Sequence, residues 1–309
     1  MTLSLVTGGA GFIGSHLVRA LRARGDSVRV LDNFSTGRRE NLNGVVGLDL
    51  REGDLRDAAA VEDAVRSVDY IFHLAAFISV PQSMTDPETC LAVNIGGTSS
   101  LFEKARRVGV RKIAIASSTA VYGDTEVFPI TEELPLHPLS PYAVSKQVTE
   151  VLARLYTRTF NLPIVPLRFF NVYGPRQRPD SHYAAAVPIF IRRVLDNRPI
   201  TIYGDGKQTR DFVFIGDVVD ALMRAVASDA AGDPFNICSG RETTIIDLVE
   251  QLRGFAKYPP EVRFEAPRAG DIYRSFGSSD KAAAAFGFHA QTSLADGLKQ
   301  TLDWMSSGL

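Results

Sequence analysis

The glycine-rich segment at residues 7–14 constrains the fold of this chain more than any other part of the sequence. It follows an apolar run, Leu3 to Thr7, which predicts a strand, and it opens a stretch, Ile13 to Arg24, whose apolar residues recur at helical spacing. Three of its glycines have the spacing that matters here: Gly8, Gly11 and Gly14. The first permits a tight bend, the second lets a pyrophosphate approach the backbone, and the third lets the helix pack closely on the sheet. Because the helix amino terminus then faces an anion, the segment predicts a dinucleotide-binding turn.

The first half of the chain repeats this alternation of strand and helix. Further strands are predicted at Ser27 to Leu31, Tyr70 to Leu74 and Lys112 to Ala116, and helices at Ala58 to Val65 and Asn94 to Val108. Strands that alternate with helices are typical of βαβ units, in which each crossover makes the next strand parallel. We therefore expect an α/β fold with a doubly wound parallel sheet of the Rossmann type.

A second, smaller α/β lobe is expected beyond about residue 170, where the alternation gives way to a polar, turn-rich stretch at 174–180. Helical spacing returns at Thr244 to Phe255 and Leu294 to Met305. We expect residues 171–211 and 241–309 to form this lobe. Residues 1–170 would form the dinucleotide domain, and residues 212–240, which read as a helix and a strand, would return to it.

Composition excludes several classes of function. Lys plus Arg number 34 against 35 Asp plus Glu, so the net charge of −1 offers no broad electrostatic footprint for nucleic acid or an anionic membrane. No run of 18 apolar residues is present, and no basic leader precedes an apolar core. Cys90 and Cys238 lie far apart without metal-ligand spacing, so we expect reduced thiols, no metal site and a cytoplasmic protein.

Two carboxylates are candidates for contact with the dinucleotide. Asp32 ends the second predicted strand, 18 residues after Gly14, where it could accept hydrogen bonds from ribose hydroxyls and would repel a 2′-phosphate. This favours NAD over NADP, and the alternative is that an aspartate before Asn33 only starts a turn. Asp54 follows the next short apolar segment, where it could meet the adenine amino group or cap a helix.

Three polar side chains suggest acid–base chemistry. Tyr142 and Lys146 stand at i and i+4, on one face of a predicted helix, and the cation would help to hold a phenolate near neutral pH. Ser118 follows the strand Lys112 to Ala116, at the carboxyl edge of the sheet where open α/β folds bind ligands. Such a serine could hold a substrate oxygen, or it could satisfy backbone groups at the strand end.

Seven motifs in order make the chain resemble the extended short-chain dehydrogenase/reductase family over nearly its whole length: TGGAGFIG, GDLRD, HLAA, SSTAVYG, YAVSK, LRFFNVYGPRQ and GDGKQTRDFVFIGD. Within that family the pattern is most similar to the UDP-hexose 4-epimerases. The resemblance implies that Ser118, Tyr142 and Lys146 are catalytic. It implies an NAD site formed by Gly8, Gly11, Phe12, Ile13, Gly14, Asp32, Asn33, Asp54, Leu55, Leu74, Ala75, Ala76, Asn94, Tyr142 and Lys146.

The same resemblance implies the substrate residues and the reaction. A UDP-hexose would contact Ser118, Asn171, Val187 in the loop beyond it, Tyr203, Arg210, Arg268, Asp271 and Ser275. Arginines suit a diphosphate because the guanidinium fork binds two oxygens. Tyr142 would take the proton of the 4-hydroxyl while NAD takes the C4 hydride, and the resulting 4-keto sugar would turn and receive the hydride on its other face.

Three alternatives to a UDP-hexose 4-epimerase are considered. A 4,6-dehydratase would carry an Asp-Glu pair where this chain has Thr119-Ala120. The segment GPRQRPD at 174–180 is also similar to UDP-glucuronate 4-epimerases. A binding role without catalysis is known for relatives that have lost the Tyr or Lys, and this chain keeps both.

Substrate range and assembly are also implied by the family pattern. Ser275 stands where glucose-restricted epimerases have a bulky residue, so we expect the N-acetylhexosamine forms to be accepted alongside UDP-glucose and UDP-galactose. We expect a homodimer in which Asn94 to Val108 and Tyr142 to Phe160 of each copy form a four-helix bundle.

Overall fold

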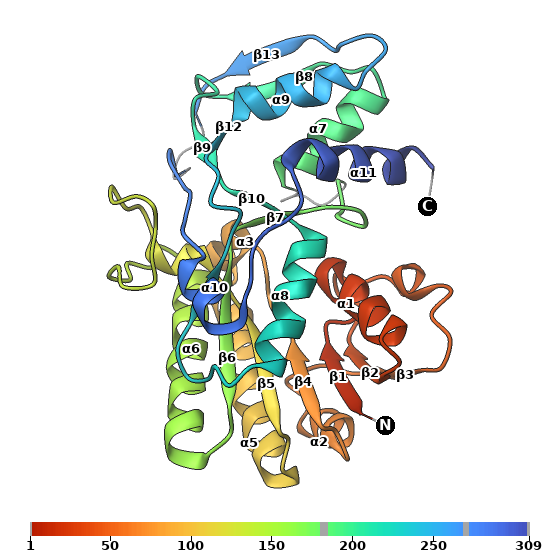
Figure 1. Cartoon of the computed structure of the whole chain (residues 1–309), viewed down its shortest axis with the longest axis vertical. Coiled ribbons are helices and arrows are strands. Elements are labelled where there is room, and N and C mark those ends of the chain that lie inside the picture. Colours follow the sequence, from red (N-terminus) through yellow and green to blue (C-terminus); the bar gives the residue numbers. More distant parts are fainter. Residues whose placement is uncertain (1, 180–184, 268–271, 308–309) are drawn as a thin grey trace.

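The larger part of the molecule is built around a seven-stranded sheet (Figure 1). The computed structural model describes residues 2–179, 185–267 and 272–307. Every strand pair in the sheet is parallel, and the order is β11-β6-β5-β4-β1-β2-β3. Its strands are β1 (Leu3–Thr7), β2 (Ser27–Asp32), β3 (Leu48–Glu52), β4 (Tyr70–His73), β5 (Lys112–Ser118), β6 (Ile164–Phe169) and β11 (Phe235–Ile237). The order reverses between β1 and β4, which confirms the predicted doubly wound sheet.

Helices cover both faces of the sheet because successive strand residues point to opposite sides. Leu5 belongs to the apolar cluster beneath α2 (Ala58–Val65), α5 (Thr98–Val108) and α6 (Pro141–Phe160). The next residue, Val6, belongs to the cluster beneath α1 (Phe12–Ala23) and α8 (Ile215–Ala227). Both side chains are fully buried, and each such burial contributes about 1.5–3 kcal/mol. The site is therefore held on a rigid, three-layered support.

The smaller lobe lies beyond the carboxyl edge of the sheet (Figure 1). Three pairs of short strands build it: β7 (Asn171–Tyr173) with β10 (Phe212–Phe214), β8 (Ile200–Tyr203) with β13 (Val262–Glu265), and β9 (Thr209–Arg210) with β12 (Thr243–Thr244). Its helices are α7 (Ala186–Leu195), α9 (Ile245–Gly254) and α11 (Leu294–Ser306). Between β10 and β12 the chain returns to the sheet as α8 and β11, and α10 (Asp280–Phe286) packs on β11.

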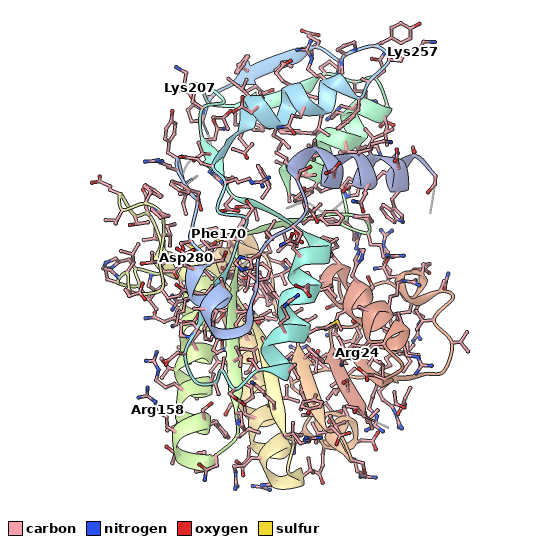
Figure 2. The ribbon with its side chains drawn as sticks, in the orientation of Figure 1. Arg24, Arg158, Phe170, Lys207, Lys257 and Asp280 are labelled. Carbon is pink, nitrogen blue, oxygen red and sulfur yellow. The ribbon has the colours of Figure 1, made fainter. Side chains whose placement is uncertain are left out.

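Phe170 marks the junction of the two parts (Figure 2). Its backbone N–H donates to Ile237 O in β11, so the chain stays bonded to the sheet up to Phe170 and enters the smaller lobe at Asn171. A Cβ at Gly277 would lie only 2.2 Å from the Phe170 ring, so only a glycine lets the later segment cross here. This contact fixes the segment that carries Ser275 against the end of the sheet.

The remaining short elements surround the carboxyl edge. They are η1 (Arg39–Leu42), α3 (Val80–Thr85), α4 (Pro87–Leu91), the π-helix η2 (Ala92–Gly97) and η3 (Thr119–Tyr122). The helix predicted over Asn94 to Val108 thus begins as a π-helix, and α5 takes over at Thr98. Within the described ranges, no helix is both long enough and apolar enough to cross a membrane.

Candidate active site

The glycine-rich turn has no room for side chains at two of its three predicted positions. Gly8 has a φ of 70°, and a Cβ there would lie 2.7 Å from the backbone nitrogen of Ala75. A Cβ at Gly14 would lie 2.1 Å from Gly8 O. Gly11 precedes α1, and in the described part of the chain no side chain caps that helix. The backbone amides of Phe12 and Ile13 are therefore the natural donors for an anionic group.

Asp32 is almost fully buried at the carboxyl end of β2. Its Oδ1 accepts from Phe34 N at 2.8 Å and its Oδ2 from Ala10 N at 2.9 Å. Burial raises the pKa of this carboxyl, and the two backbone donors oppose the rise. Asp32 therefore does start a turn, and the same carboxylate joins that turn to the glycine-rich segment, where the adenosine ribose is predicted.

Asp54 lies beside Asp32's turn. Asn33 Nδ2 donates to Asp54 Oδ2 at 2.8 Å. Hydrogen bonds from the Arg56 guanidinium hold the pKa of Asp54 well below its usual range. The N-cap of α2 is Asp57, whose side chain accepts from two backbone amides, so the interpretation of Asp54 as a helix cap is wrong. Leu55, which follows, is buried.

Thr7 at the end of β1 binds both His73, the last residue of β4, and the segment that follows it. His73 is fully buried between two hydroxyls, with Nδ1 2.7 Å from Thr7 Oγ1 and Nε2 2.9 Å from Thr98 Oγ1. Burial lowers the pKa of His73 to about 3, so the imidazole carries no charge at neutral pH. Thr7 Oγ1 also accepts from the backbone amides of Leu74 and Ala75. A small cavity beside His73 is lined by Ala75, Ala76, Asn94 and Lys146.

Ser118, Tyr142 and Lys146 meet at the carboxyl end of β5. Tyr142 and Lys146 lie in the first two turns of α6, whose start is set by Pro141 at N1 and by Ser140 as N-cap. Lys146 Nζ donates to Ala116 O at 2.8 Å and lies 5.8 Å from the centroid of the Tyr142 ring.

The electrostatics of this group come mainly from burial. Burial lowers the pKa of Lys146 to about 8 and raises the pKa of Tyr142. A hydrogen bond with Ser118 opposes the rise at Tyr142, because it stabilises the phenolate. The arrangement can hold a hydroxyl oxygen near Ser118 and exchange its proton with Tyr142, while Lys146 supplies the nearby positive charge.

Asn94 lies within the π-helix and is almost fully buried. Its Oδ1 accepts from Phe77 N at 2.7 Å, and its Nδ2 donates to Ser145 Oγ at 2.8 Å. Asn94 therefore joins the segment after β4 to the helix that carries Tyr142. π-Helical turns of this kind frequently accompany functional sites.

A cavity of about 450 Å³ opens in the smaller lobe. Four predicted substrate residues line it: Asn171, Val187, Tyr203 and Arg210. Asn171, which lines the cavity, lies two residues beyond Phe169, the sheet partner of Ser118. Its size is typical of a small-molecule site.

Four of the substrate predictions need further comment. Val187 was expected in a loop, but it lies in the first turn of α7 because apolar residues at 187, 190, 191 and 194 form the buried face of that helix. Ser275 is buried beside Thr209 and is not among the described residues that line the cavity. Arg268 and Asp271 lie outside the described residues.

Arg193 and Gln208 also line the cavity and are not among the predicted site residues. Arg193 shares a face of α7 with Ala186 and Ile189, since positions i, i+3 and i+7 coincide on a helix. That spacing was the available signal. Gln208 is buried, and its Nε2 donates to Tyr203 O at 2.6 Å, which holds the strand β8 at the cavity wall.

A doubly wound sheet with this glycine-rich first turn defines a dinucleotide-dependent enzyme of the Rossmann type. A sequence model described as the NAD dependent epimerase/dehydratase family matches residues 4–238. The chain belongs to this family, and NAD is its cofactor.

Similar proteins extend over the whole chain. UDP-glucose 4-epimerase of Mycolicibacterium smegmatis is 41% identical over 306 residues, which cover 97% of both chains. The structure of UDP-glucose 4-epimerase from Thermotoga maritima with UDP-glucose has a TM-score of 0.95 at 38% identity and covers 99% of both chains. That of UDP-N-acetylglucosamine 4-epimerase from Methanobrevibacter ruminantium M1, in complex with UDP-N-acetylmuramic acid, has a TM-score of 0.96 at 35% identity and covers 100% of this chain and 99% of the other.

Proposed function

We propose that this protein inverts C4 of a UDP-hexose, with NAD recycled in each turnover. The observation that supports this most is that Ser118, Tyr142 and Lys146 meet at the carboxyl edge of the sheet, where Ser118 pairs with Phe169, two residues before the cavity residue Asn171. The similarity to epimerases named for UDP-sugars supports the nucleotide. The cofactor would lie across the turn at Gly8, Gly11 and Gly14, with Asp32 at its adenosine ribose. Bound NAD supplies a reversible acceptor for the C4 hydride.

The chain's own residues would perform the proton transfer. Tyr142, as phenolate, takes the proton from the 4-hydroxyl and later returns it. Ser118 donates to the reacting oxygen and Lys146 keeps the phenolate charged. Asn171, Tyr203 and Arg210 anchor the UDP portion in the cavity while the sugar turns, because only the diphosphate end needs to stay fixed.

The substrate range rests on Ser275. A small side chain there leaves space around C2, so we propose that UDP-N-acetylgalactosamine and UDP-N-acetylglucosamine are converted together with UDP-galactose and UDP-glucose. The backbone N–H of Ser275 donates to Thr209 Oγ1, and the next residue, Arg210, lines the cavity.

A 4,6-dehydratase is disfavoured because Thr119 and Ala120 in η3 offer no carboxylate next to Ser118. A UDP-glucuronate 4-epimerase stays the second candidate, on the segment at 174–180 alone. Only residues 174–179 of that segment are described.

The test is direct conversion. The purified protein is incubated with UDP-galactose, UDP-N-acetylgalactosamine or UDP-glucuronate, with and without added NAD, and the C4 isomers are separated chromatographically. Conversion of either of the first two supports the proposal, and Tyr142→Phe should remove it. Conversion of the glucuronate alone would favour the second candidate, and no conversion of any of the three would refute C4 inversion.

We further propose a cytoplasmic homodimer, with the sheet domain binding NAD and the smaller lobe binding UDP. An apolar stripe on α6 supports the dimer, because Val144, Val151 and Leu155 share one helix face and are all exposed in the single chain. Sedimentation at micromolar concentration tests it, and a monomer mass would contradict a four-helix bundle of α5 and α6.

A further inference from the structure

A buried ion pair lies just behind the reacting group. Glu150 is on α6, one turn beyond Lys146 and two beyond Tyr142. Arg168 is on β6, and its Nε and Nη2 donate to the two oxygens of Glu150 at 2.9 and 2.7 Å. The side chains are only 6% and 3% exposed.

The same carboxylate also reaches the strand that carries Ser118. Ser117 Oγ donates to Glu150 Oε1 at 2.5 Å, and Ser117 immediately precedes Ser118 in β5. One carboxylate on α6 thus holds β5 through Ser117 and β6 through Arg168. These are the elements that place Ser118 and, two residues past β6, Asn171.

Arg168 extends the network toward the last strand of the sheet. Its Nη1 donates to Tyr122 OH at 2.7 Å, and Tyr122 OH donates to Asn236 Oδ1 at 2.7 Å. Asn236 in turn is held by Ile130 O and by Glu132. The donors and acceptors of the pair are therefore widely satisfied, which is the condition for a rigid buried network.

Stability alone does not account for such a pair. Removing two charges from water costs several kcal/mol per ion, and apolar residues of similar volume often stabilise a fold as well or better. What an ion pair supplies and an apolar pair does not is a fixed geometry and a local charge. Both would act on Lys146 here, because Glu150 is its neighbour at i+4.

The groups around Lys146 leave Glu150 with a defined electrostatic role. His73, from β4, is neutral, and Cys90, from α4, carries a charge only as a thiolate, which burial disfavours. From α6 itself come Tyr142 and Glu150, and the Glu150 charge opposes the fall that burial causes in the pKa of Lys146. Around Glu150 the charged or titratable groups are Arg168, Tyr122 and, through Asn236, Glu132.

We propose that Glu150 is a positioning residue for the reaction: it holds the Ser118 strand against the Tyr142 helix and keeps Lys146 charged, with Arg168 as its counter-ion. This role rests on the proposed function, since Ser118, Tyr142 and Lys146 are the groups it serves.

Because Glu150 and Arg168 carry opposite charges, their single variants should shift the pH profile in opposite directions. Glu150→Gln removes an anion and leaves Arg168 unbalanced, so both the Lys146 ammonium and the Tyr142 phenol lose protons more readily. Both limbs of the pH profile of kcat/KM then move to lower pH, by about one pH unit. Arg168→Met leaves the Glu150 charge unbalanced and moves both limbs to higher pH. Glu150→Asp keeps the charge, so the profile stays in place while kcat falls about tenfold or more.

The double variant Glu150→Gln/Arg168→Met is the control that separates a charge effect from a loss of folding. It keeps the net charge of the pair at zero and should return the profile to within a few tenths of a pH unit of the wild type. The purely structural alternative predicts a lower melting temperature and a lower kcat with unmoved limbs in every variant. Unmoved limbs in the single variants, or a shift of the profile in the same direction in Glu150→Gln and in Arg168→Met, would overturn the proposal.

A second readout does not need activity. The phenolate absorbance of Tyr142 is followed by ultraviolet titration of the NAD-bound protein, with the same variant in a Tyr142→Phe background subtracted. The midpoint should fall in Glu150→Gln and rise in Arg168→Met. If the wild type converts no UDP-hexose but these midpoints move as expected, the proposed function fails and the electrostatic role of Glu150 stands. If conversion occurs and the midpoints do not move, the role fails alone.

Discussion

Replacing Lys146 by methionine should stabilise the NAD-free protein at neutral pH while it removes the activity. Lys146 is only 6% exposed, and the hydrogen bond from its ammonium to Ala116 O only partly replaces the hydration of the charge. A pKa lowered from 10.5 to about 8 corresponds to about 3 kcal/mol of destabilisation while the lysine is charged in both folded and unfolded chains. The lost charge-assisted hydrogen bond offsets about 1.5 kcal/mol of this. A net gain of about 1–2 kcal/mol remains.

The pH dependence of this gain identifies its cause. Between pH 8 and 10.5 the folded wild type has lost the Lys146 proton and the unfolded chain still binds it. The unfolded chain therefore binds more protons in this window, and wild-type stability rises with pH relative to the methionine variant. The gain is complete below about pH 8 and should shrink as the pH rises toward 10.5.

Thermal unfolding by circular dichroism at pH 7 and pH 9.5 measures this difference. At pH 7 the variant should melt about 2–6 °C above the wild type, and the gap should narrow at pH 9.5. Lys299→Met is the matched control, because Lys299 is 63% exposed beside Asp303 and should change the melting temperature little at either pH. A Lys146→Met protein that melts below the wild type at pH 7, or a gap equal at both pH values, would refute the assignment of a desolvated ammonium.

Two further substitutions test the cavity. Arg193→Leu removes a cation from the cavity wall and should weaken the binding of UDP about tenfold, with little change in the binding of uridine, because the guanidinium is expected to contact a phosphate. Titration calorimetry with both ligands measures this. Equal losses of affinity for UDP and uridine would instead place Arg193 at the uracil base. Ser275→Tyr fills space beside Thr209 and should lower kcat/KM for UDP-N-acetylgalactosamine at least tenfold more than for UDP-galactose; a parallel loss for both sugars would contradict a role in selecting the C2 substituent.

The sheet half of the fold follows closely from local sequence. The strand at Leu3–Thr7 and the helix at Ala58–Val65 have the predicted bounds, because their periodicity is unbroken and their ends carry turn or cap residues. The smaller lobe was less predictable. Its strands span two to four residues, and β9 finds its partner β12 more than 30 residues later, so no periodic signal precedes the pairing.

The parts of the site that escaped sequence reasoning depend on tertiary contacts. The π-helical turn at Asn94 is fixed by hydrogen bonds to Phe77, a residue 17 positions earlier that no helical spacing connects to it. Val187 follows residues outside the described ranges, and its apolar helix face became evident only with the buried cluster of the smaller lobe.

Buried charged residues are the part of the candidate active site that sequence patterns predict least well. Asp, Glu, Lys and Arg lie mostly at the surface of proteins, so residue type alone does not predict the burial of Glu150 and Arg168. The structure buries these two together with Lys146 and Asp32, all on elements of the sheet domain. A buried charge lowers stability unless it is paired, and it persists where a fixed charge serves chemistry. Burial of the Lys146 charge lowers the stability of the NAD-free protein, and the same burial strengthens the effect of that charge on Tyr142. Because Glu150 is the anion one turn from Lys146, its removal should shift the pH profile of the reaction.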